Sequence, residues 1–480
     1  MVRGDRDLES ICAIATPLGI GGISVIRLSG PQSLSIIQKI APFLPAAPES
    51  HRVYYGNLIS HSVETAGEIL DEVLISFFKA GRSFTGENTF EISCHGSPQI
   101  CRRILKELVL SGARIADRGE FTYRAFMVGR LDLVQAESIL ALIQSQSDLS
   151  AKQALRQLSG ELSGALIEIE DELIWCLAHI EASIDFSTED IEIVTNDELR
   201  TRFLNVKAHL EKLLGTYKQG RLLKDGVRLV LAGEPNVGKS SLLNLLVEED
   251  RAIVTETPGT TRDTIEAGFL VDGIKVVVTD TAGLRQTDDK VEQKGIARSY
   301  KAVEDADRIF FVYDSSKNMN AGEMAELEKL ETNRLYIVGN KQDLAQKPIE
   351  NTLKTLVSEL KTLKNFQKID DFSHFIETRV HFVSAWDTSS SQLLKNALAK
   401  DFEVNKIEDG ALISQARRFE NLSRAMENME RSAILLDKGM SSEFLALEMK
   451  ESLLAVQETL GKRFDDQIMD RVFKEFCIGK

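Results

Sequence analysis

The sequence has few cysteines, and they are scattered. Only five occur in 480 residues, at Cys12, Cys94, Cys101, Cys176 and Cys477, and no two of them form a CxxC pair. This odd number and wide spacing argue against a disulfide framework and a cysteine-based zinc site, and indicate a reducing compartment. The seven histidines form no HxxxH-type cluster that would suggest another metal site.

Long hydrophobic runs are also missing. No run approaches the roughly 20 residues that a membrane-spanning helix needs. The first residues, Met-Val-Arg-Gly-Asp-Arg-Asp, carry too much charge for the start of a signal peptide. These observations predict a cytoplasmic protein that does not associate with membranes.

The chain has no net positive charge, because 73 acidic residues outnumber 58 Lys and Arg residues and give a net charge of −15. This balance argues against a broad, non-specific grip on nucleic acid. A local basic patch or a partner protein could still hold a nucleic acid.

The length suggests about three domains, and the character of the chain changes along it. Residues 1–121 predict a mixed α/β domain, residues 122–224 the first part of a helical domain, and residues 401–480 its second part. Residues 225–400 alternate strand and helix. The predicted fold class is therefore α/β plus α, with a doubly wound α/β domain inserted into a helical domain. Two separate helical domains are the alternative.

The pattern of residues 225–400 is the most informative. Buried strands are predicted at Arg228–Ala232, Lys275–Thr279, Ile309–Tyr313 and Leu335–Val338, with helices between them. This alternation is typical of a parallel, doubly wound sheet.

A phosphate-binding motif follows the first of these strands. Gly233-Glu-Pro-Asn-Val-Gly238-Lys239-Ser240 matches GxxxxGK[ST] and opens a predicted helix. Its glycines let backbone N–H groups surround phosphates at a helix N-terminus. Lys239 is expected to reach the β- and γ-phosphates and Ser240 to hold Mg²⁺. The predicted nucleotide-binding residues here are Asn236, Val237, Gly238, Lys239, Ser240 and Ser241.

Three further elements appear in the order that a Ras-like GTPase requires, each after a predicted strand. They are Asp280-Thr281-Ala282-Gly283, Asn340-Lys341-Gln-Asp343 and Ser384-Ala385. Asp280 is expected to bind Mg²⁺ through water, and Gly283 to sense the γ-phosphate. Asp343 can accept two hydrogen bonds from the N1 and N2 groups of guanine, and adenine lacks the second donor, so GTP is preferred over ATP. Ser384-Ala385 would supply a backbone contact to guanine O6.

The segment between the first two elements predicts a mobile switch loop. Thr261 is the expected second hydroxyl ligand of Mg²⁺, although Thr260 could fill that role by sequence alone. The predicted nucleotide-binding residues of this loop are Thr255, Glu256, Thr257, Pro258, Gly259, Thr260 and Thr261.

The catalytic group is less obvious. Small Ras-type GTPases orient the attacking water with a glutamine directly after DxxG, but Leu284 stands there in this chain. Acidic candidates for that role are Glu292, Asp288 and Asp289. The candidate transition-state cations are Arg262, Arg285 or a K⁺ ion held by Asn236 against the phosphates.

Further motifs lie outside the nucleotide-binding region. They include Thr16-Pro-Leu-Gly-Ile-Gly-Gly22, Ser83-Phe-Thr-Gly-Glu-Asn-Thr-Phe-Glu91, Cys94-His-Gly96, Gly119-Glu-Phe-Thr-Tyr-Arg-Ala-Phe126 and the terminal Phe476-Cys-Ile-Gly-Lys480. Together with the Gly259–Asp263 switch, they make the chain resemble the tRNA modification GTPase family MnmE, also called TrmE, along essentially its whole length.

The resemblance implies a tRNA-modifying enzyme. Members work with the FAD-dependent protein MnmG in a hetero-oligomer. Together they add an aminomethyl or carboxymethylaminomethyl group to C5 of the wobble uridine of certain tRNAs. The one-carbon unit comes from a tetrahydrofolate derivative, 5,10-methylene or 5-formyl, bound by the N-terminal domain. The family's folate-binding positions fall on Arg27, Glu91, Arg130 and Lys480.

The resemblance also implies how GTP is hydrolysed. The family is stimulated by K⁺ and acts as a homodimer whose G domains meet. The K⁺ ligands fall on Asn236, Thr255, Thr257 and Thr260, and the water-activating glutamate on Glu292. Cys477 matches the family's terminal cysteine, whose thiol could attack C6 of uracil or be a packed tail residue.

The chain departs from the family pattern at two places, Ile20 in the usual Gly-Arg-Gly-Gly and Ser97 after His95-Gly96. A regulatory switch GTPase, such as a ribosome-assembly factor, is the alternative function. Folate binding by the N-terminal region would distinguish the two.

Overall fold

The computed structural model describes residues 9–63, 65–185, 195–248, 267–280, 301–402, 410–464 and 466–480. The chain divides into two compact units, which we describe separately. The first comprises Met1–Ile143, Ala154–Leu214 and Arg417–Lys480, and the second Gln144–Gln153 and Gly215–Ala416.

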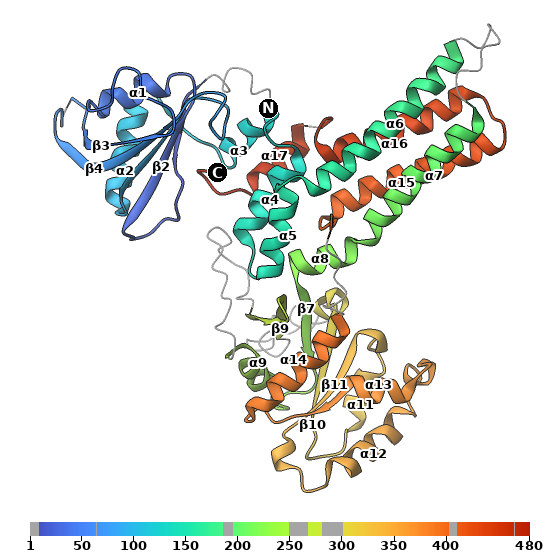
Figure 1. Ribbon diagram of the computed structural model, residues 1–480. Helices are drawn as coiled ribbons and strands as arrows, with labels where there is room; N and C mark the ends of the chain where they lie inside the picture. Colours follow the sequence, from blue (N-terminus) through green and yellow to red (C-terminus); the bar gives the residue numbers. More distant parts are fainter. Residues whose placement is uncertain are drawn as a thin grey trace, which may run out of the picture. The chain divides into compact units, whose positions relative to one another are not determined.

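The N-terminal part of the first unit is a six-stranded sheet covered by two helices (Figure 1). The strand order is β3-β4-β5-β2-β1-β6, and all neighbours are antiparallel except β1 and β6. Buried side chains of α1 and α2, such as Ile37 and Ile104, share one core with strand residues such as Ile26 and Ile92. The elements are β1 (Ile11–Ile14), β2 (Ile23–Ser29), α1 (Ser33–Ile40), β3 (Arg52–Ile59), β4 (Ile69–Phe78), β5 (Thr89–His95), α2 (Pro98–Leu110) and β6 (Arg114–Ile115).

The register of β2 and β5 places the predicted folate residues together. Ile26 and Leu28 are buried in the core. Because side chains alternate along a strand, Arg27 projects from the opposite face. It pairs directly with Glu91 of β5 in the antiparallel register.

The rest of the first unit is helical. Its helices are α3 (Glu120–Met127), α4 (Leu133–Gln144), α6 (Glu161–Asp185), α7 (Asn196–Gly215), α15 (Ala416–Asp437), α16 (Ser442–Leu460) and α17 (Asp466–Lys474). Helix α5 (Asp148–Leu158) is divided, and only its part from Ala154 onward belongs to this unit. Helices α6 and α16 lie side by side although far apart in sequence (Figure 1), and Gln457 donates to Glu170 across them at 3.1 Å. Ion pairs such as Arg200–Asp437 join α7 to α15 in the same way. Helices from both ends of the chain therefore form one assembly.

A buried ion cluster joins α4, α5 and α15. Arg418 is fully buried, and its guanidinium donates to Glu137 at 2.6 Å and to Gln157 at 3.0 Å. Arg417 also binds Glu137. Burial alone would raise the pKa of Glu137, but Arg418 and Arg417 outweigh it and lower the pKa. The carboxylate therefore stays ionised inside the protein.

The second unit is a doubly wound α/β domain. Its sheet has the order β12-β11-β10-β7-β9-β8, and only β8 runs antiparallel to its neighbour. The strands are β7 (Val227–Ala232), β8 (Ala267–Val271), β9 (Ile274–Asp280), β10 (Arg308–Asp314), β11 (Leu335–Asn340) and β12 (Val380–Phe382). This order reverses direction at β7, so the carboxyl end of β7 lies at the switch point where such folds bind ligands.

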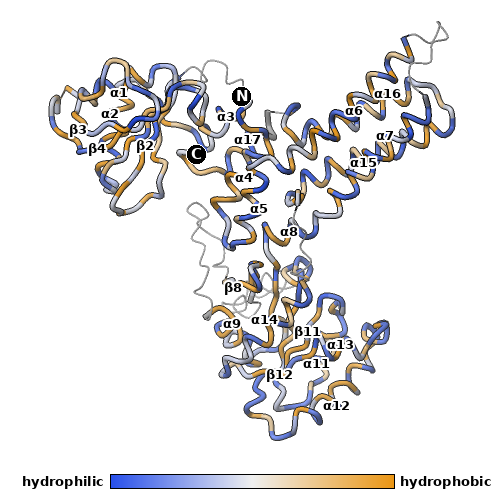
Figure 2. The backbone as a smooth tube through the Cα atoms, viewed as in Figure 1, coloured by the Kyte–Doolittle hydropathy of each residue, from blue (hydrophilic) through white to orange (hydrophobic). Residues whose placement is uncertain are grey.

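Helices cover both faces of this sheet. Leu229 and Leu231 point to the core shared with α9 and α14, whereas Val230 and Ala232 point to the core shared with α11, α12 and α13. Figure 2 shows the central strands as mainly hydrophobic, as expected for strands buried on both faces. The helices are α8 (Tyr217–Asp225), α9 (Lys239–Glu248), α11 (Ala321–Leu327), α12 (Ile349–Leu360), α13 (Phe372–Arg379) and α14 (Thr388–Phe402). Short 3-10 helices lie at Thr332–Arg334, Gln342–Leu344 and Phe366–Lys368.

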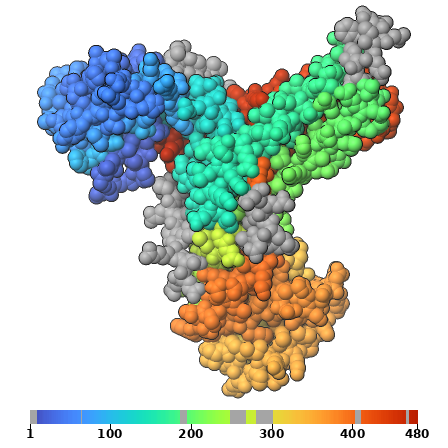
Figure 3. Space-filling model, in the orientation of Figure 1, coloured from blue at the N-terminus to red at the C-terminus, as the bar shows by residue number. Residues whose placement is uncertain are grey.

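The predicted fold class is confirmed: an α/β N-terminal part, a helical part and a doubly wound domain between its halves. The strands predicted from residues 225–400 match β7, β9, β10 and β11 within two residues at each end. In Figure 3, α14 lies in orange on the surface of the second unit. Among the described helices, none combines the length and apolar character needed to cross a membrane.

The predicted domain boundaries stay predictions, but two segments of the predicted first helical part group differently from them. Residues Gln144–Gln153 and α8 belong to the second unit. Leu149 packs on its core, and a Cβ atom at Gly273 would lie 3.0 Å from the Leu149 side chain. This hydrophobic contact is long-range, so the helical periodicity of α5 could not reveal it.

Candidate functional site

The phosphate-binding loop runs from the end of β7 to the start of α9. Gly238 lies immediately before α9 with φ +96°. A Cβ atom there would lie 2.3 Å from Nδ2 of Asn340. Gly238 is therefore required twice, by its backbone conformation and by the close approach of another motif.

Lys239 is held on the inside of this loop. Its Nζ donates to the backbone oxygens of Gly233 at 2.8 Å and Glu234 at 2.7 Å, and the residue is 5% exposed. The ammonium group therefore lies next to the backbone N–H groups at the start of α9, where an anion is favoured. Asn236 is exposed at the loop's outer turn and Ser240 at the start of the helix.

Asn340 joins three predicted motifs. Its Nδ2 donates to the Val237 carbonyl at 2.9 Å, and its Oδ1 accepts from the Ala385 N–H at 3.1 Å. The side chain is almost fully buried, at 1% exposure. The structure thus brings the phosphate loop, the Asn-Lys-Gln-Asp element and the Ser-Ala element to one end of the sheet, as predicted.

The expected guanine-binding side is also assembled. Ser384 Oγ donates to Asp343 Oδ1 at 2.6 Å, which fixes the orientation of the carboxylate. Trp386 is 88% exposed beside this pair. The carboxylate and the Ala385 backbone are therefore held in the neighbourhood that guanine recognition requires.

The sequence analysis missed Asp314, which positions Lys341. Asp314 ends β10, and its Oδ2 accepts from Lys341 Nζ at 2.9 Å. Burial alone would raise the pKa of Asp314, but hydrogen bonds from Ser316 and Lys341 outweigh it, so the pKa lies below its ordinary value. An acidic residue at the end of the strand next to β11 was the available signal.

Many predicted residues lie outside the described part of the chain. Asp280 ends β9, but its side chain is not among those described. The switch-loop and catalytic predictions that fall outside are Thr255, Glu256, Thr257, Pro258, Gly259, Thr260, Thr261, Arg262, Thr281, Ala282, Gly283, Arg285, Asp288, Asp289 and Glu292.

A second cluster lies on the N-terminal sheet, where Arg27 and Glu91 form an ion pair. Arg27 Nη2 lies 2.7 Å from Glu91 Oε1, and Arg27 Nη1 donates to the Gly479 carbonyl at 3.4 Å. The guanidinium also lies 5.5 Å from the ring centroid of Phe121 and 5.9 Å from that of Phe84. The Arg27 guanidinium is therefore flanked by two aromatic rings and by the C-terminal tail, whereas the Glu91 side chain stays partly exposed.

The tail itself is fixed to this domain by backbone bonds. The Phe121 N–H donates to the Lys480 carbonyl at 3.2 Å, and the Gly119 N–H to the Cys477 carbonyl at 3.4 Å. Cys477 is exposed. Arg27, Glu91 and Gly479 therefore lie together, with Lys480 the next residue of the fixed tail, and their role in folate binding stays a prediction.

Arg130 joins the edge of the same cluster. Its guanidinium donates to the Ser83 carbonyl at 2.6 Å, next to Phe84. Ser83 Oγ is buried and has no hydrogen-bond partner within the described chain.

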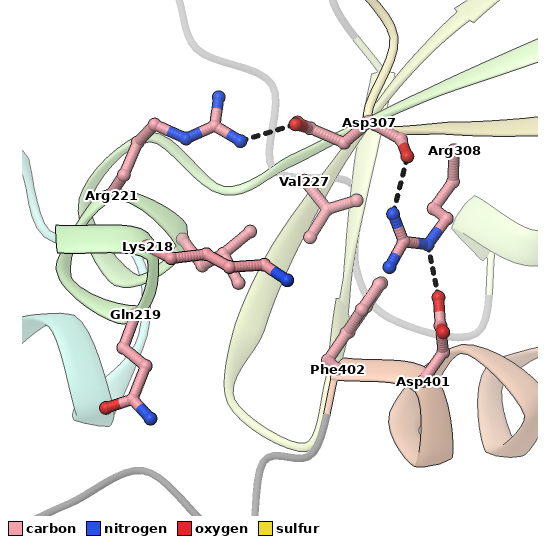
Figure 4. Close-up of a pocket in the computed structure, with 9 residues that line it drawn as sticks. Lys218, Gln219, Arg221, Val227, Asp307, Arg308, Asp401 and Phe402 are labelled. Atoms are coloured by element: carbon pink, nitrogen blue, oxygen red, sulfur yellow. Dashed lines mark hydrogen bonds and ion pairs between the residues drawn. The ribbon is translucent and has the colours of Figure 1, made fainter. Parts of the chain in front are cut away.

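A cavity of about 170 Å³ lies in the second unit, at the end of its sheet opposite the phosphate loop (Figure 4). Val227 and Arg308, at the starts of β7 and β10, line it, whereas the phosphate loop follows the end of β7. Figure 4 shows two ion pairs in its lining, Arg221 with Asp307 and Arg308 with Asp401, and the side chain of Lys218 beside them. We therefore interpret this cavity as a structural ion-pair cluster, separate from the nucleotide site.

No group of three or more His, Cys, Asp or Glu side chains with the arrangement of a metal site occurs in the described ranges. The predicted Mg²⁺ and K⁺ residues are hydroxyls and an amide, which such a cluster would not include.

Two family models match the chain. The model described as MnmE helical domain matches residues 133–477, and that described as GTP-binding protein TrmE N-terminus matches residues 10–130. Among solved structures, the G domain of the T. maritima FeoB iron transporter is 25% identical and covers 36% of this chain and 97% of its own, with a TM-score of 0.24. A score this low supports no inference.

Curated relatives extend over the full length. A Bdellovibrio bacteriovorus protein named tRNA modification GTPase MnmE is 57% identical over 484 residues, covering 100% of this chain and 99% of its own. A protein of the same name from Alkaliphilus oremlandii is 35% identical and covers 98% of this chain and 99% of its own. The full-length identity and the two matching models show that this chain belongs to the MnmE family of tRNA modification GTPases.

Proposed function

We propose that this chain is a K⁺-stimulated GTPase that takes part in modifying the wobble uridine (position 34) of certain tRNAs. It acts in the cytoplasm as a homodimer, together with an FAD-dependent partner, MnmG. The complex adds an aminomethyl or carboxymethylaminomethyl group to C5 of the uracil, with the one-carbon unit supplied by a tetrahydrofolate derivative. The curated relatives support this proposal because they carry the name tRNA modification GTPase.

The observation that carries the GTPase part is the Asn340 bridge. The Asn340 side chain joins Val237 of the phosphate loop to Ala385. Asp343 lies three residues after Asn340 in the same motif. GTP phosphates at the start of α9 and guanine at Asp343 and Ala385 fit this arrangement. Lys239 and the helix N-terminus would hold the phosphates, and Asp343 would accept from guanine N1 and N2.

Two of the residues that would hold cations, Asn236 and Ser240, lie in the described part of the phosphate loop and of α9, where bound phosphates would be. Ser240 and Thr261 would hold Mg²⁺, which supplies charge neutralisation between the β- and γ-phosphates when bound. Asn236 would hold K⁺ with Thr255, Thr257 and Thr260. Asn236 lies at the outer turn of the phosphate loop with φ +64°. Glu292 would orient the attacking water, with Arg262 and Arg285 as additional candidates.

The N-terminal cluster would bind the folate. Glu91 can accept from the donor edge of a pterin, and the cations of Arg27, Arg130 and Lys480 suit an anionic glutamate tail. The Ser83 hydroxyl, which has no hydrogen-bond partner within the described chain, could donate or accept one further hydrogen bond. Cys477, exposed on the tail next to this cluster, is the proposed nucleophile toward uracil C6.

The test is a GTPase assay in K⁺ against Na⁺, run across a range of protein concentrations. We expect hydrolysis at least about tenfold faster in K⁺, because a cation replaces the charge of an arginine finger, worth about 10³ or more elsewhere. Specific activity should rise with concentration if two G domains must meet.

Asn236→Ala is the matched variant, which should lose the K⁺ effect while still binding GDP. Equal rates in the two salts would contradict the cation mechanism. Activity independent of concentration would contradict the dimer.

A further inference from the structure

The second residue of the phosphate loop carries a carboxylate, which is an unexpected group beside bound phosphates. Glu234 Oε2 accepts a hydrogen bond from Asn320 Nδ2 at 3.0 Å. Asn320 is 86 residues away and lies immediately before α11. The bond therefore joins the phosphate loop to a helix on one face of the sheet.

The orientation of the Asn320 amide is fixed by α11. Its Oδ1 accepts from the backbone N–H groups of Gly322 at 2.7 Å and Glu323 at 2.9 Å. In return, the Glu323 carboxylate accepts from the Asn320 N–H at 2.9 Å, which completes a capping box. Because the oxygen of the amide is committed to the helix, its NH₂ group must be the one that meets Glu234.

The backbone of Glu234 serves the nucleotide site. Its carbonyl accepts from Lys239 Nζ at 2.7 Å, beside the bond from Lys239 to Gly233. One residue is thus held at its side chain by α11 and at its carbonyl by the phosphate-binding lysine. Restraining the side chain restrains the carbonyl that holds Lys239.

The charge of Glu234 does not itself suit phosphate binding. A carboxylate in the loop repels bound phosphates, and Glu234 also contributes to raising the pKa of Glu323, whose main cause is burial. The presence of the Glu234 carboxylate in the phosphate loop is therefore better explained by its hydrogen bond from Asn320 than by its charge.

We propose that Glu234 is a positioning residue for GTP, whose bond to Asn320 fixes the phosphate loop and Lys239 relative to α11. This inference rests on the proposed GTPase function. It predicts that the two side chains act as one unit in nucleotide binding.

The first experiment measures GDP and GTP dissociation constants for Glu234→Ala, Asn320→Ser and the double variant. Serine keeps an N-cap oxygen but has no amide donor for Glu234, so Asn320→Ser removes the tether with little change to the cap. We expect each single variant to bind about five- to tenfold more weakly, and the double variant no more weakly than either. Independent, multiplying losses would overturn the proposal.

The second experiment exchanges donor and acceptor. Asn320→Asp keeps the cap but sets two carboxylates against each other, so nucleotide affinity should fall further than in Asn320→Ser. Adding Glu234→Gln supplies an NH₂ group from the other side and should restore affinity to within about twofold of wild type. A general loosening of α11 would not be rescued, so failure of the exchange would overturn the proposal.

A matched control is Asn365→Ser. Asn365 Nδ2 donates to the carbonyls of Leu327 and Leu330, at the other end of α11, with no link to the phosphate loop. This variant should lower the melting temperature and leave nucleotide affinity unchanged. If wild type bound no guanine nucleotide, the proposed function would fail. If wild type bound guanine nucleotide normally and Glu234→Ala bound it equally well, only the proposed role of the Glu234–Asn320 bond would fail.

Discussion

The two candidate sites are built in different ways. The nucleotide site is made from residues at or just after the carboxyl ends of the parallel strands β7, β11 and β12, so Val237, Asn340 and Ala385 meet at one sheet end. The N-terminal site closes only when the last residues of the chain return to the first strands, with Arg27 bound to the Gly479 carbonyl 452 positions away. The nucleotide site can be recognised from local sequence motifs. The N-terminal site depends on contacts between the first strands and the last residues of the chain. The two should therefore respond to different mutations.

The largest effect is expected from the buried ion cluster of the first unit. Glu137→Ala leaves Arg418 buried without its carboxylate, which should cost about 3–5 kcal/mol of unfolding free energy. Denaturant unfolding followed separately for the two units should show the loss in the first unit only. The double variant Glu137→Leu/Arg418→Met should recover most of the lost unfolding free energy, because the fully buried charge of Arg418 is removed and Arg417, which also loses Glu137, is partly exposed. If Glu137→Ala also weakened GTP binding by a similar free energy, the two units would not be independent in this respect.

The next effect sharpens the nucleotide side of the comparison. Asp343→Asn should weaken GTP binding about 100-fold, since the hydrogen bonds lost to a charged acceptor are worth about 3 kcal/mol. Xanthine nucleotide should gain, because an amide can donate to its 2-oxo group. Competition binding measures the affinities for the guanine and the xanthine nucleotide. Folate binding by the same variant is the internal control and should not change. Unchanged guanine preference would contradict the assignment of this motif.

A smaller effect should appear only at the N-terminal site. Gly479 has φ +94°, and a Cβ atom there would lie 2.1 Å from the Ile14 carbonyl oxygen. Gly479→Ala should therefore open the tail at a cost of about 1–3 kcal/mol, weakening binding of 5-formyl-tetrahydrofolate by about tenfold or more. Calorimetric titration of the full chain measures this.

GTP affinity should not change in Gly479→Ala. The control is Gly164→Ala in α6, where an added Cβ meets nothing within 4 Å. Wild-type folate binding in Gly479→Ala would show that tail closure does not matter.

The smallest effect concerns acid stability of the second unit. The pKa of Asp314 is lowered from 3.8 in the folded state, so its contribution is present above that value and is lost as the pH falls through the folded pKa. Asp314→Asn should make the unfolding free energy of this unit fall less steeply below about pH 4. Asp370→Asn, at an exposed surface position of the same unit, is the control. Identical acid profiles for wild type and Asp314→Asn would contradict this role.

Much of the nucleotide-binding unit could be predicted because its signals are local. The apolar runs that became β7, β9, β10 and β11 were visible in the sequence, and each motif directly follows a strand. The antiparallel edge strand β8 was missed. Its residues Ala267–Val271 form a short run beside the switch loop and do not follow the strand–helix alternation. The Glu234–Asn320 and Asp314–Lys341 contacts were also missed, because side-chain partners on different elements leave no periodic signal.

The sequence by itself determined the alternation of strands and helices, the order of the nucleotide motifs and the family resemblance. It could do so because apolar periodicity and strand-end motifs depend on neighbours in the chain. Only the tertiary structure decided that the tail packs on the first sheet, that Arg418 is buried against Glu137, and that Gln144–Gln153 group with the second unit. Those outcomes depend on which distant surfaces exclude water together, and no local pattern encodes that choice.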